Sequence, residues 1–144
     1  MKLAEVIAMR SKDPNTQVGA CIVDDKNRVI SLGYNGLPNN CSDDKFPWSR
    51  EGIIEVYTKY PYVVHAELNA ILNSDRDLKG CTIYITVSPC RECVKAIIQS
   101  GIKEIVYANE YKKGGISIKK DICADSLIKS SGIKYRKYNN KKEK

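Results

Sequence analysis

Apolar residues form two kinds of pattern along this chain, and each pattern predicts one kind of element. Near the start they recur at helical spacing, at Leu3, Val6, Ile7 and Met9. Other apolar segments are short and bounded by turn residues, which is typical of β-strands. The pattern predicts helices over residues 2–10, 64–72, 90–100 and about 116–130, and strands over residues 17–23, 28–34, 81–87, 103–108 and 133–138.

The order of these elements predicts the class of fold. The first two strands are joined by turn residues at 24–27, so we expect an antiparallel hairpin. The later strands are separated by single helices, which implies right-handed crossovers and parallel pairing. We therefore expect a three-layer α/β domain over residues 1–138, followed by a basic, disordered tail over residues 139–144.

A long segment without either pattern, residues 35–62, separates the second strand from the second helix. A loop of this length inside a compact domain is usually either functional or disordered. The aromatic residues Trp48, Tyr57 and Tyr60 favour an ordered loop.

The formal net charge of +7 suggests a polyanionic partner, but the distribution of charge along the chain does not. Residues 134–144 hold six basic side chains and one acidic one, whereas residues 1–133 hold 18 basic and 16 acidic ones. A nucleic-acid groove needs positive charge on the folded surface, so we expect no nucleic-acid partner.

The chain has neither a run of about 18 apolar residues nor a secretory leader pattern, so we expect no membrane span and a cytoplasmic location.

Metal-binding residue types gather in two short motifs. His65, the only histidine, precedes Glu67 by two residues, and Cys90 and Cys93, the only closely spaced pair among six cysteines, follow Pro89. Both motifs fall where a predicted helix begins, and the free N–H groups there favour thiolates. A structural zinc has four protein ligands, whereas a catalytic zinc keeps one position for water. One histidine and two cysteines therefore predict a catalytic zinc site.

Glu67 has the position and chemistry of a proton carrier. Hydrolytic attack at C4 of cytosine needs a proton on N3 and another on the departing amine, and one carboxylate can transfer both from water. The combination of H-x-E with P-C-x-x-C is a signature of zinc-dependent nucleobase deaminases. We therefore expect Glu67 to be the catalytic residue of a deaminase.

Each motif taken alone has another explanation. A lone histidine is usually a surface or core residue, and a C-x-x-C pair that opens a helix also resembles a thioredoxin-like redox site. A purely structural zinc module is a further alternative, which predicts four protein ligands and tolerance of the substitution Glu67→Ala.

Several longer segments resemble one family. They are residues 10–20, 33–38, 41–44, 60–62, 65–71 and 89–93. Through them the chain resembles the deoxycytidylate (dCMP) deaminase family of the cytidine deaminase-like superfamily, over about residues 10–138. The resemblance implies a five-stranded mixed sheet flanked by helices, and the conversion of dCMP to dUMP and ammonia for thymidylate synthesis.

The resemblance also implies a role for individual residues. It implies one Zn²⁺ bound by His65, Cys90 and Cys93, and proton transfer by Glu67. It places Asn35 at the sugar 3′-hydroxyl, although an Asn-Gly pair is also an ordinary turn.

Further substrate contacts follow from the same resemblance, and each has a plain structural alternative. Those implied for the base are the pocket wall at Val18 and Gly19 and the backbone groups of Ala66 and Ser88. Candidates for the 5′-phosphate are Arg10, Ser11, Lys12 and Asn15, with Arg91 as another, although each charge could simply be solvated. Tyr107 and Tyr111 are candidates for an aromatic contact, although core packing explains Tyr107 equally well.

Regulation and assembly are also implied by the resemblance. Members of the family are commonly hexamers, activated by dCTP and inhibited by dTTP, so we expect a homo-oligomer with these effectors and possible Mg²⁺ beside the nucleotide. The corresponding residues are Gly33, Tyr34, Gly36, Asp43 and Asp44. Asn40 occupies a position in this segment where members of the family commonly have glycine. The chain has no further histidine that could bind the second, structural zinc found in some relatives.

Two neighbouring functions stay open at this point. A deaminase of tRNA or single-stranded DNA shares the zinc motif, but it needs basic and aromatic surface around the flipped base. A cytidine deaminase of free nucleosides should be indifferent to the 5′-phosphate. The nearly neutral body of the chain argues against the polynucleotide alternative.

Overall fold

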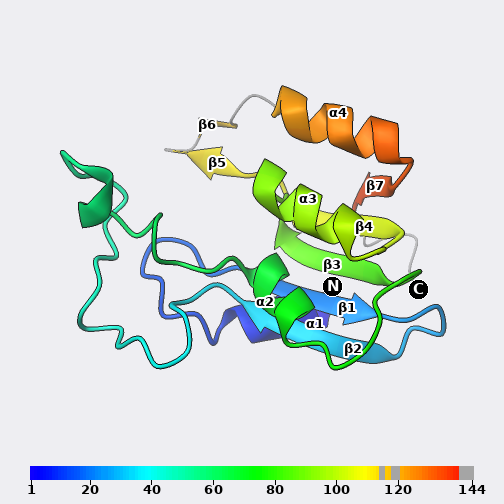
Figure 1. Ribbon diagram of the computed structural model, residues 1–144, viewed down its shortest axis with the longest axis horizontal. Helices are drawn as coiled ribbons and strands as arrows, with labels where there is room; N and C mark the ends of the chain where they lie inside the picture. Colours follow the sequence, from blue (N-terminus) through cyan, green and yellow to red (C-terminus); the bar gives the residue numbers. More distant parts are fainter. Residues whose placement is uncertain (114–115, 118–120, 140–144) are drawn as a thin grey trace.

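The computed structural model describes residues 1–113, 116–117 and 121–139. Five strands form one sheet in the order β2-β1-β3-β4-β7 (Figure 1). These strands are β1 Gly19–Val23, β2 Val29–Tyr34, β3 Thr82–Val87, β4 Glu104–Asn109 and β7 Lys134–Lys137. The helices are α1 Lys2–Ala8, α2 Ala66–Leu72, α3 Arg91–Gln99 and α4 Ile122–Ser131, with a short 3-10 helix η1 at Glu55–Tyr57.

The sheet is mixed because its first strands form a hairpin and its later ones are joined by helices. β1 pairs antiparallel with both β2 and β3, whereas β3 pairs parallel with β4 and β4 with β7. In the hairpin turn, the Asp24 carboxylate accepts hydrogen bonds from the N–H groups of Lys26 and Arg28 at 2.9 and 2.8 Å. The predicted hairpin and the predicted mixed five-stranded sheet are both confirmed.

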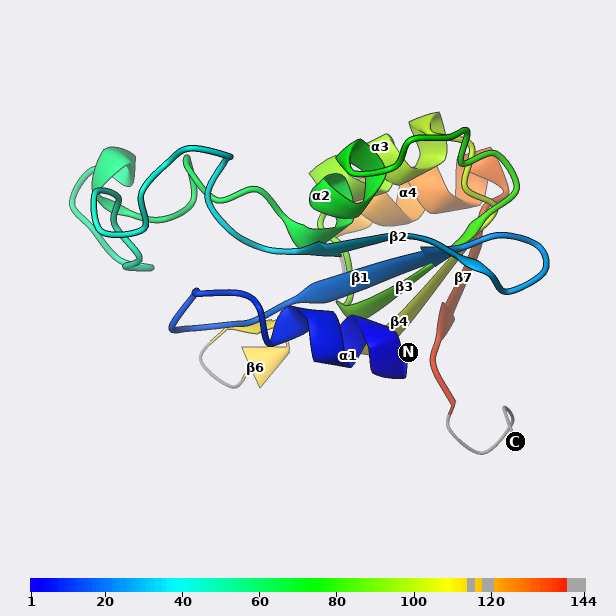
Figure 2. The ribbon, with the colours of Figure 1, turned by 90° about the horizontal axis from the view of Figure 1, so that it is seen from below.

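Helices cover both faces of this sheet (Figure 2). α1 lies on one face, and α2, α3 and α4 lie on the other. The predicted three-layer α/β architecture is therefore confirmed. None of the helices in the described ranges combines the length and the apolar character that a membrane crossing needs.

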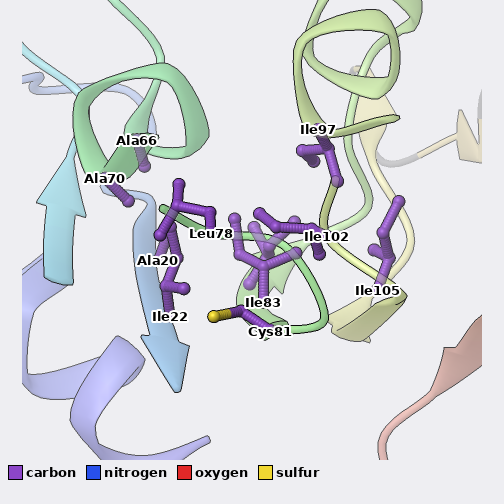
Figure 3. Packing of buried hydrophobic residues seen from close by; sticks show 11 residues of the cluster. Ala20, Ile22, Ala66, Ala70, Leu78, Cys81, Ile83, Ile97, Ile102 and Ile105 are labelled. Carbon is purple, nitrogen blue, oxygen red and sulfur yellow. The ribbon is translucent and has the colours of Figure 1, made fainter. Parts of the chain in front are cut away.

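Branched aliphatic side chains fill the space between the sheet and α2 and α3. Ile22, Ile83 and Ile105 from the three central strands are fully buried, and Ile97 of α3 packs on the same cluster (Figure 3). Burying one such side chain contributes about 1.5–3 kcal/mol. This cluster fixes the two helices that carry the metal motifs against the sheet.

The predicted helix over residues 116–130 is shorter in the structure, and its first residues form a strand. The predicted helix over 116–130 begins later, at Ile122, because the Asp121 carboxylate caps its first turn by accepting from the N–H groups of Cys123 and Ala124. Ile116–Ser117 instead forms a short strand, β6, paired with β5 at Lys112–Lys113. Of the predicted tail, residues 140–144 lie outside the described residues.

The apolar residues that predicted α1 are not the ones that bury it. Ala4 and Ala8 face the sheet and are buried, whereas Leu3, Val6 and Met9 are exposed. The helix lies so close to β1 that a Cβ on Gly19 would be 1.9 Å from the Ala4 carbonyl oxygen. Only small side chains fit at such a distance.

A long arm, defined here as residues 37–63, projects from the body of the domain (Figures 1 and 2). Its base is closed by a bridge in which Gly36 and Val64 exchange two backbone hydrogen bonds of 3.1 and 2.8 Å. The arm carries η1 and is otherwise irregular. The predicted absence of regular helices and strands over most of this segment is thus what the structure shows.

The contact between α2 and β2 depends on Gly33. A Cβ at this position would lie 2.2 Å from the Ala66 carbonyl oxygen and 2.3 Å from the Ala70 nitrogen. The Ser31 hydroxyl also donates to the Ala70 carbonyl at 2.6 Å. Gly33 thus sets how closely α2 approaches the sheet.

We expect Gly33→Ala to push α2 away from β2 and to lower the free energy of unfolding by about 2 kcal/mol or more. Gly36→Ala is the matched control, because a methyl group there would meet only the Tyr34 ring at 3.7 Å, which is an ordinary contact. Urea denaturation of the two variants measures the difference. Unchanged stability of Gly33→Ala would contradict this description of the α2 contact.

Candidate active site

The two metal-binding motifs meet because their helices begin next to each other. His65 is the N-cap residue of α2 and Cys90 is the N-cap residue of α3, and both have extended backbone. Cys93 lies in the first turn of α3 and is buried. The Nδ1 atom of His65 is 3.5 Å from the Cys90 sulfur and 3.4 Å from the Cys93 sulfur.

This spacing suits a tetrahedral metal ion. Zinc–sulfur bonds of about 2.3 Å and zinc–nitrogen bonds of about 2.0–2.1 Å at a tetrahedral angle separate the two ligand atoms by roughly 3.6 Å. The ligand atoms of His65, Cys90 and Cys93 all lie within 4.8 Å of one another. In the described part of the chain this is the one group of three or more metal-ligating residues, and it contains no fourth member.

Of the three residues, Cys90 carries the negative charge that favours a cation between them. A hydrogen bond with Cys93, assisted by His65, lowers the pKa of Cys90 to about 4. The same sulfur–sulfur hydrogen bond, together with burial, raises the pKa of Cys93. The hydrogen bond to Cys90 raises the pKa of His65. Cys90 is therefore a thiolate, and α3 directs its free N–H groups towards it.

Glu67 lies beside this group, in the first turn of α2. Its side chain is buried, and this burial raises the pKa of the carboxyl group. A carboxyl group with a raised pKa changes its protonation state more readily near neutral pH than an exposed one. Its position and its pKa are those of a group that can both accept and donate a proton.

A cavity of about 780 Å³ opens beside Glu67. It is large enough for a nucleotide-sized ligand. Of the predicted site residues it is lined by Val18, Asn35, His65, Ala66, Glu67, Ser88, Cys90, Tyr107 and Tyr111. The structure therefore brings His65, Cys90, Glu67 and six of the predicted substrate-binding residues to one cavity.

Asn35 is held in place by its own neighbours. Its side-chain oxygen accepts from the Val18 N–H at 2.7 Å, and its Nδ2 donates to the Thr16 carbonyl at 2.9 Å and to Asp13 at 3.3 Å. Both amide hydrogens are thus engaged, and only the oxygen has a lone pair left. Towards a sugar hydroxyl Asn35 can therefore act as an acceptor only.

The far wall of the cavity is built around Ser88. The Ser88 N–H donates to the Asn109 carbonyl at 2.8 Å, so its carbonyl oxygen is the backbone group that can accept from a base. The Ser88 hydroxyl accepts from the Tyr111 N–H at 3.0 Å. Tyr107 also lines the cavity, where its hydroxyl donates to Glu110 at 2.7 Å and its ring stacks on Tyr135 with centroids 4.8 Å apart. Tyr107 thus has both a packing role and a place in the wall.

The remaining predicted substrate contacts are not among the residues that line the cavity. Gly19 was expected to approach the base, but its missing side chain makes room for α1. Arg10 lies over the Tyr34 ring at 5.9 Å, and Lys12 pairs with Asp43 at 2.5 Å. Ser11 is buried and donates to the Asn35 carbonyl at 2.7 Å.

Two other predicted phosphate contacts, Asn15 and Arg91, also lie outside the cavity lining and contact other parts of the chain. Asn15 donates to the Trp48 carbonyl at 2.8 Å, which ties the loop before β1 to the arm. Arg91 pairs with Asp121 at 3.2 Å, so it joins the start of α3 to the cap of α4.

The cavity contains two basic residues that the sequence did not indicate. Arg50 and Lys59 come from the arm, and both line the cavity. They lie in a segment without hydrophobic period, so no pattern shows where their side chains point. The one available signal was that Lys59 directly precedes residues 60–62, a segment of the family resemblance.

Asp13 connects these residues to the rest of the site. Its carboxylate is completely buried and forms an ion pair with Lys59, whose side chain is 10% exposed. It also accepts from the N–H groups of Asn15 and Thr16 at 2.8 and 3.3 Å. Burial opposes ionisation of Asp13, but the Lys59 ammonium and these N–H donors outweigh it and lower its pKa.

The residues expected to bind effectors lie along β2 and the arm rather than in the cavity. Gly33 packs under α2, and Gly36 bridges to Val64, the residue before His65. Tyr34 lies under Arg10, and Asp43 pairs with Lys12. Asp44 is not part of any metal-binding group within the described residues.

Known proteins with the same features are found by sequence and by structure. The chain matches the cytidine and deoxycytidylate deaminase zinc-binding region over residues 1–109. It is 47% identical over 145 residues to the deoxycytidylate deaminase of Mus musculus, covering 100% of this chain and 80% of that protein. It is 48% identical over 140 residues to the Homo sapiens enzyme, covering 96% and 76%.

Among solved structures, the dCMP deaminase of cyanophage S-TIM5 in complex with dCMP and dUMP superimposes with a TM-score of 0.70. The identity is 27%, and the match covers 95% of this chain and 92% of the phage chain. The fold and the site define the class: this is a hydrolytic deaminase with the cytidine deaminase-like fold. Within that class, the chain belongs to the deoxycytidylate deaminase family.

Removing the Asp13 charge tests the connection between the arm and the site. We expect Asp13→Asn to lower the free energy of unfolding by about 3 kcal/mol at pH 7, because it leaves the Lys59 ammonium buried without its partner. Because the folded-state pKa of Asp13 is lowered, its stabilising effect is present above the ordinary pKa of about 3.9 and is lost as the pH falls below it. Urea denaturation between pH 7 and pH 3 should show that the difference in free energy of unfolding between wild type and Asp13→Asn becomes smaller as the pH falls.

The exposed Asp75→Asn variant is the control for this experiment, since Asp75 lies 3.9 Å from Arg76 at the surface. It should follow the wild-type curve at every pH. A gap for Asp13→Asn that does not change with pH would contradict the ion-pair explanation.

Proposed function

We propose that this chain catalyses the hydrolytic deamination of dCMP to dUMP and ammonia, and so supplies dUMP for thymidylate synthesis. The observation that carries the proposal is the convergence of His65, Cys90 and Cys93 beside the buried Glu67, at a cavity of nucleotide size. The two mammalian relatives are named deoxycytidylate deaminases, and the phage structure contains dCMP and dUMP.

The donor set supports zinc as the cofactor. One imidazole and two thiols, one of them a thiolate, are the ligands that zinc prefers. His65, Cys90 and Cys93 would hold the ion, which when bound supplies the Lewis acidity that lowers the pKa of a water molecule towards neutrality.

The residues of the chain supply the remaining steps. Glu67 takes one proton from water and transfers it to N3 of the cytosine ring while the remaining hydroxyl bonds to C4. Glu67 then carries the proton of that hydroxyl to the exocyclic amine, and the C4–N bond breaks as ammonia leaves and the C4 carbonyl forms. Val18, Ala66 and the Ser88 carbonyl surround the base, and the Asn35 oxygen accepts from a sugar hydroxyl. The buried position of Glu67 limits the access of bulk water to these proton transfers.

The charge of the cavity favours a free nucleotide over a polynucleotide. Three acidic residues, Glu110, Asp121 and Asp125, line the part formed by the end of β4 and by α4. A nucleic-acid strand that continued across them would bring its phosphates near these carboxylates.

Substitution of Glu67 separates catalysis from metal binding. We expect Glu67→Gln, which preserves the size of the side chain, to retain one zinc per chain and to lose at least about 1000-fold in kcat, because proton transfer is removed. His65→Ala should lose both zinc and turnover. Metal content by inductively coupled plasma mass spectrometry and dCMP turnover measure the two effects, and an active Glu67→Gln enzyme would exclude the proton-transfer role.

We also propose that the chain assembles into a homo-oligomer, a hexamer by the family resemblance, and that dCTP activates it and dTTP inhibits it, with Mg²⁺ beside the nucleotide. Large apolar side chains on the arm support assembly, since Ile53, Ile54 and Tyr57 are 103%, 56% and 64% exposed. The bridge from Gly36 to Val64 joins the expected effector segment directly to His65, which supports regulation.

Light scattering and kinetics test this part of the proposal. We expect a mass that is a multiple of 16.2 kDa, activation by dCTP with Mg²⁺, and inhibition by dTTP. Ile53→Ser should shift the mass towards the monomer. A monomer whose turnover neither nucleotide changes would contradict both assembly and regulation.

A further inference from the structure

Positive charge is confined to one part of the cavity wall. Apart from His65, the basic residues that line it are Arg50 and Lys59, and both come from the arm. The part formed by Glu110, Asp121 and Asp125 is acidic, and Asp121 there forms an ion pair with Arg91, which lies outside the cavity lining. An anionic group on a ligand is therefore attracted to the arm and repelled by the end of β4 and by α4.

The two basic residues of the arm are not equivalent. Lys59 is compensated, because its ammonium forms an ion pair with the fully buried carboxylate of Asp13. Arg50 has no carboxylate within 4.0 Å among residues 1–113, 116–117 and 121–139 that could play the same part. The net positive charge of this wall therefore belongs to Arg50.

Arg50 is also incompletely hydrogen-bonded. Its Nη2 donates to the Thr16 hydroxyl, which fixes the direction of the guanidinium group. Its Nε is buried and has no partner among the described residues. A buried donor without an acceptor is unfavourable, so the guanidinium is held in a position that an additional acceptor would stabilise.

The loop that holds Arg50 is the loop that holds the proposed sugar contact. Thr16 accepts from Arg50 through its hydroxyl and from Asn35 through its carbonyl. Asp13 accepts from both Lys59 and Asn35. Arg50, which has no ion-pair partner among the described residues, and Asn35, which offers the proposed sugar contact, are therefore both hydrogen-bonded to Thr16.

We propose that Arg50 binds the 5′-phosphate of the nucleotide and makes the enzyme select a nucleoside monophosphate over the free nucleoside. This inference rests on the proposed function, since it assigns the phosphate subsite of the same cavity. A guanidinium group matches a phosphate monoester because it offers several N–H donors in one plane. Lys59 and Asp13 act as positioning residues that hold the arm and the loop together.

Turnover of two substrates tests the assignment. With zinc-loaded full-length enzyme, Arg50→Ala should lower kcat/KM for dCMP by about 100-fold and change that for deoxycytidine by less than about twofold. Arg50→Lys keeps a charge without the planar donors and should lose about tenfold for dCMP. Arg76→Ala, an exposed residue paired with Asp75, is the matched control and should leave both values unchanged.

Two results would overturn the assignment. An equal loss for dCMP and deoxycytidine in both Arg50 variants would show that Arg50 supports the fold of the arm and not the phosphate. A dCMP preference that survives Arg50→Ala but disappears in Lys137→Ala would move the subsite to the adjoining cavity of about 420 Å³, which Lys137 lines together with Thr16 and Tyr111.

Calorimetric titration with inorganic phosphate separates this inference from the proposed function. Wild type should bind inorganic phosphate, and Arg50→Ala should bind it at least about tenfold more weakly. If wild type deaminates neither substrate but still binds phosphate through Arg50, the proposed function fails and the anion subsite stands. If wild type deaminates dCMP and Arg50→Ala binds phosphate as well as wild type does, the subsite fails alone.

Discussion

The start of α2 and the start of α3 must lie next to each other on one face of the sheet, and the whole site depends on this contact. Neither motif is a metal site by itself, because His65 supplies one ligand atom and Cys90 and Cys93 supply two. The isoleucines of the central strands hold both helices on the sheet. At Gly33 the backbone of β2 approaches α2 so closely that no side chain fits between them. The precision needed for coordination therefore comes from packing several residues away from the ligands.

A second anchor joins the arm to the body of the domain. The arm is irregular and projects away from the sheet, so hydrophobic packing contributes little to its position (Figure 1). Polar contacts hold it to the body: Lys59 on Asp13, Arg50 on Thr16, Lys12 on Asp43, and Asn15 on the Trp48 carbonyl. All four reach the loop before β1, which also holds Asn35. Through this loop the position of the arm is coupled to the geometry of the cavity.

The distribution of charge follows from this arrangement. Basic groups reach the cavity from the arm, and acidic ones reach it from the end of β4 and from α4. A small ligand with one charged end has only one favourable orientation in such a cavity. That orientation is consistent with a nucleotide whose base reaches Glu67 while its phosphate stays at the arm. It is unfavourable for a polyanion that continues past both walls.

The sequence by itself determined the order of the four helices and of the five strands of the main sheet, and the identity of the metal motifs, because these depend on local pattern and spacing. It also indicated Glu67, which lies on the same helical turn as His65. Hydrophobic period did not decide which side of α1 is buried, because close approach at Gly19 selects Ala4 and Ala8 over larger apolar residues. Nor did charge along the chain show which basic residues face the cavity. Arg10 and Lys12 lie within a segment of the family resemblance, but it is Arg50 and Lys59 that reach the cavity. Their direction is set by a hydrogen bond across 34 residues of sequence and an ion pair across 46. Such contacts between distant segments exist only in the folded chain, so the tertiary structure alone decided them.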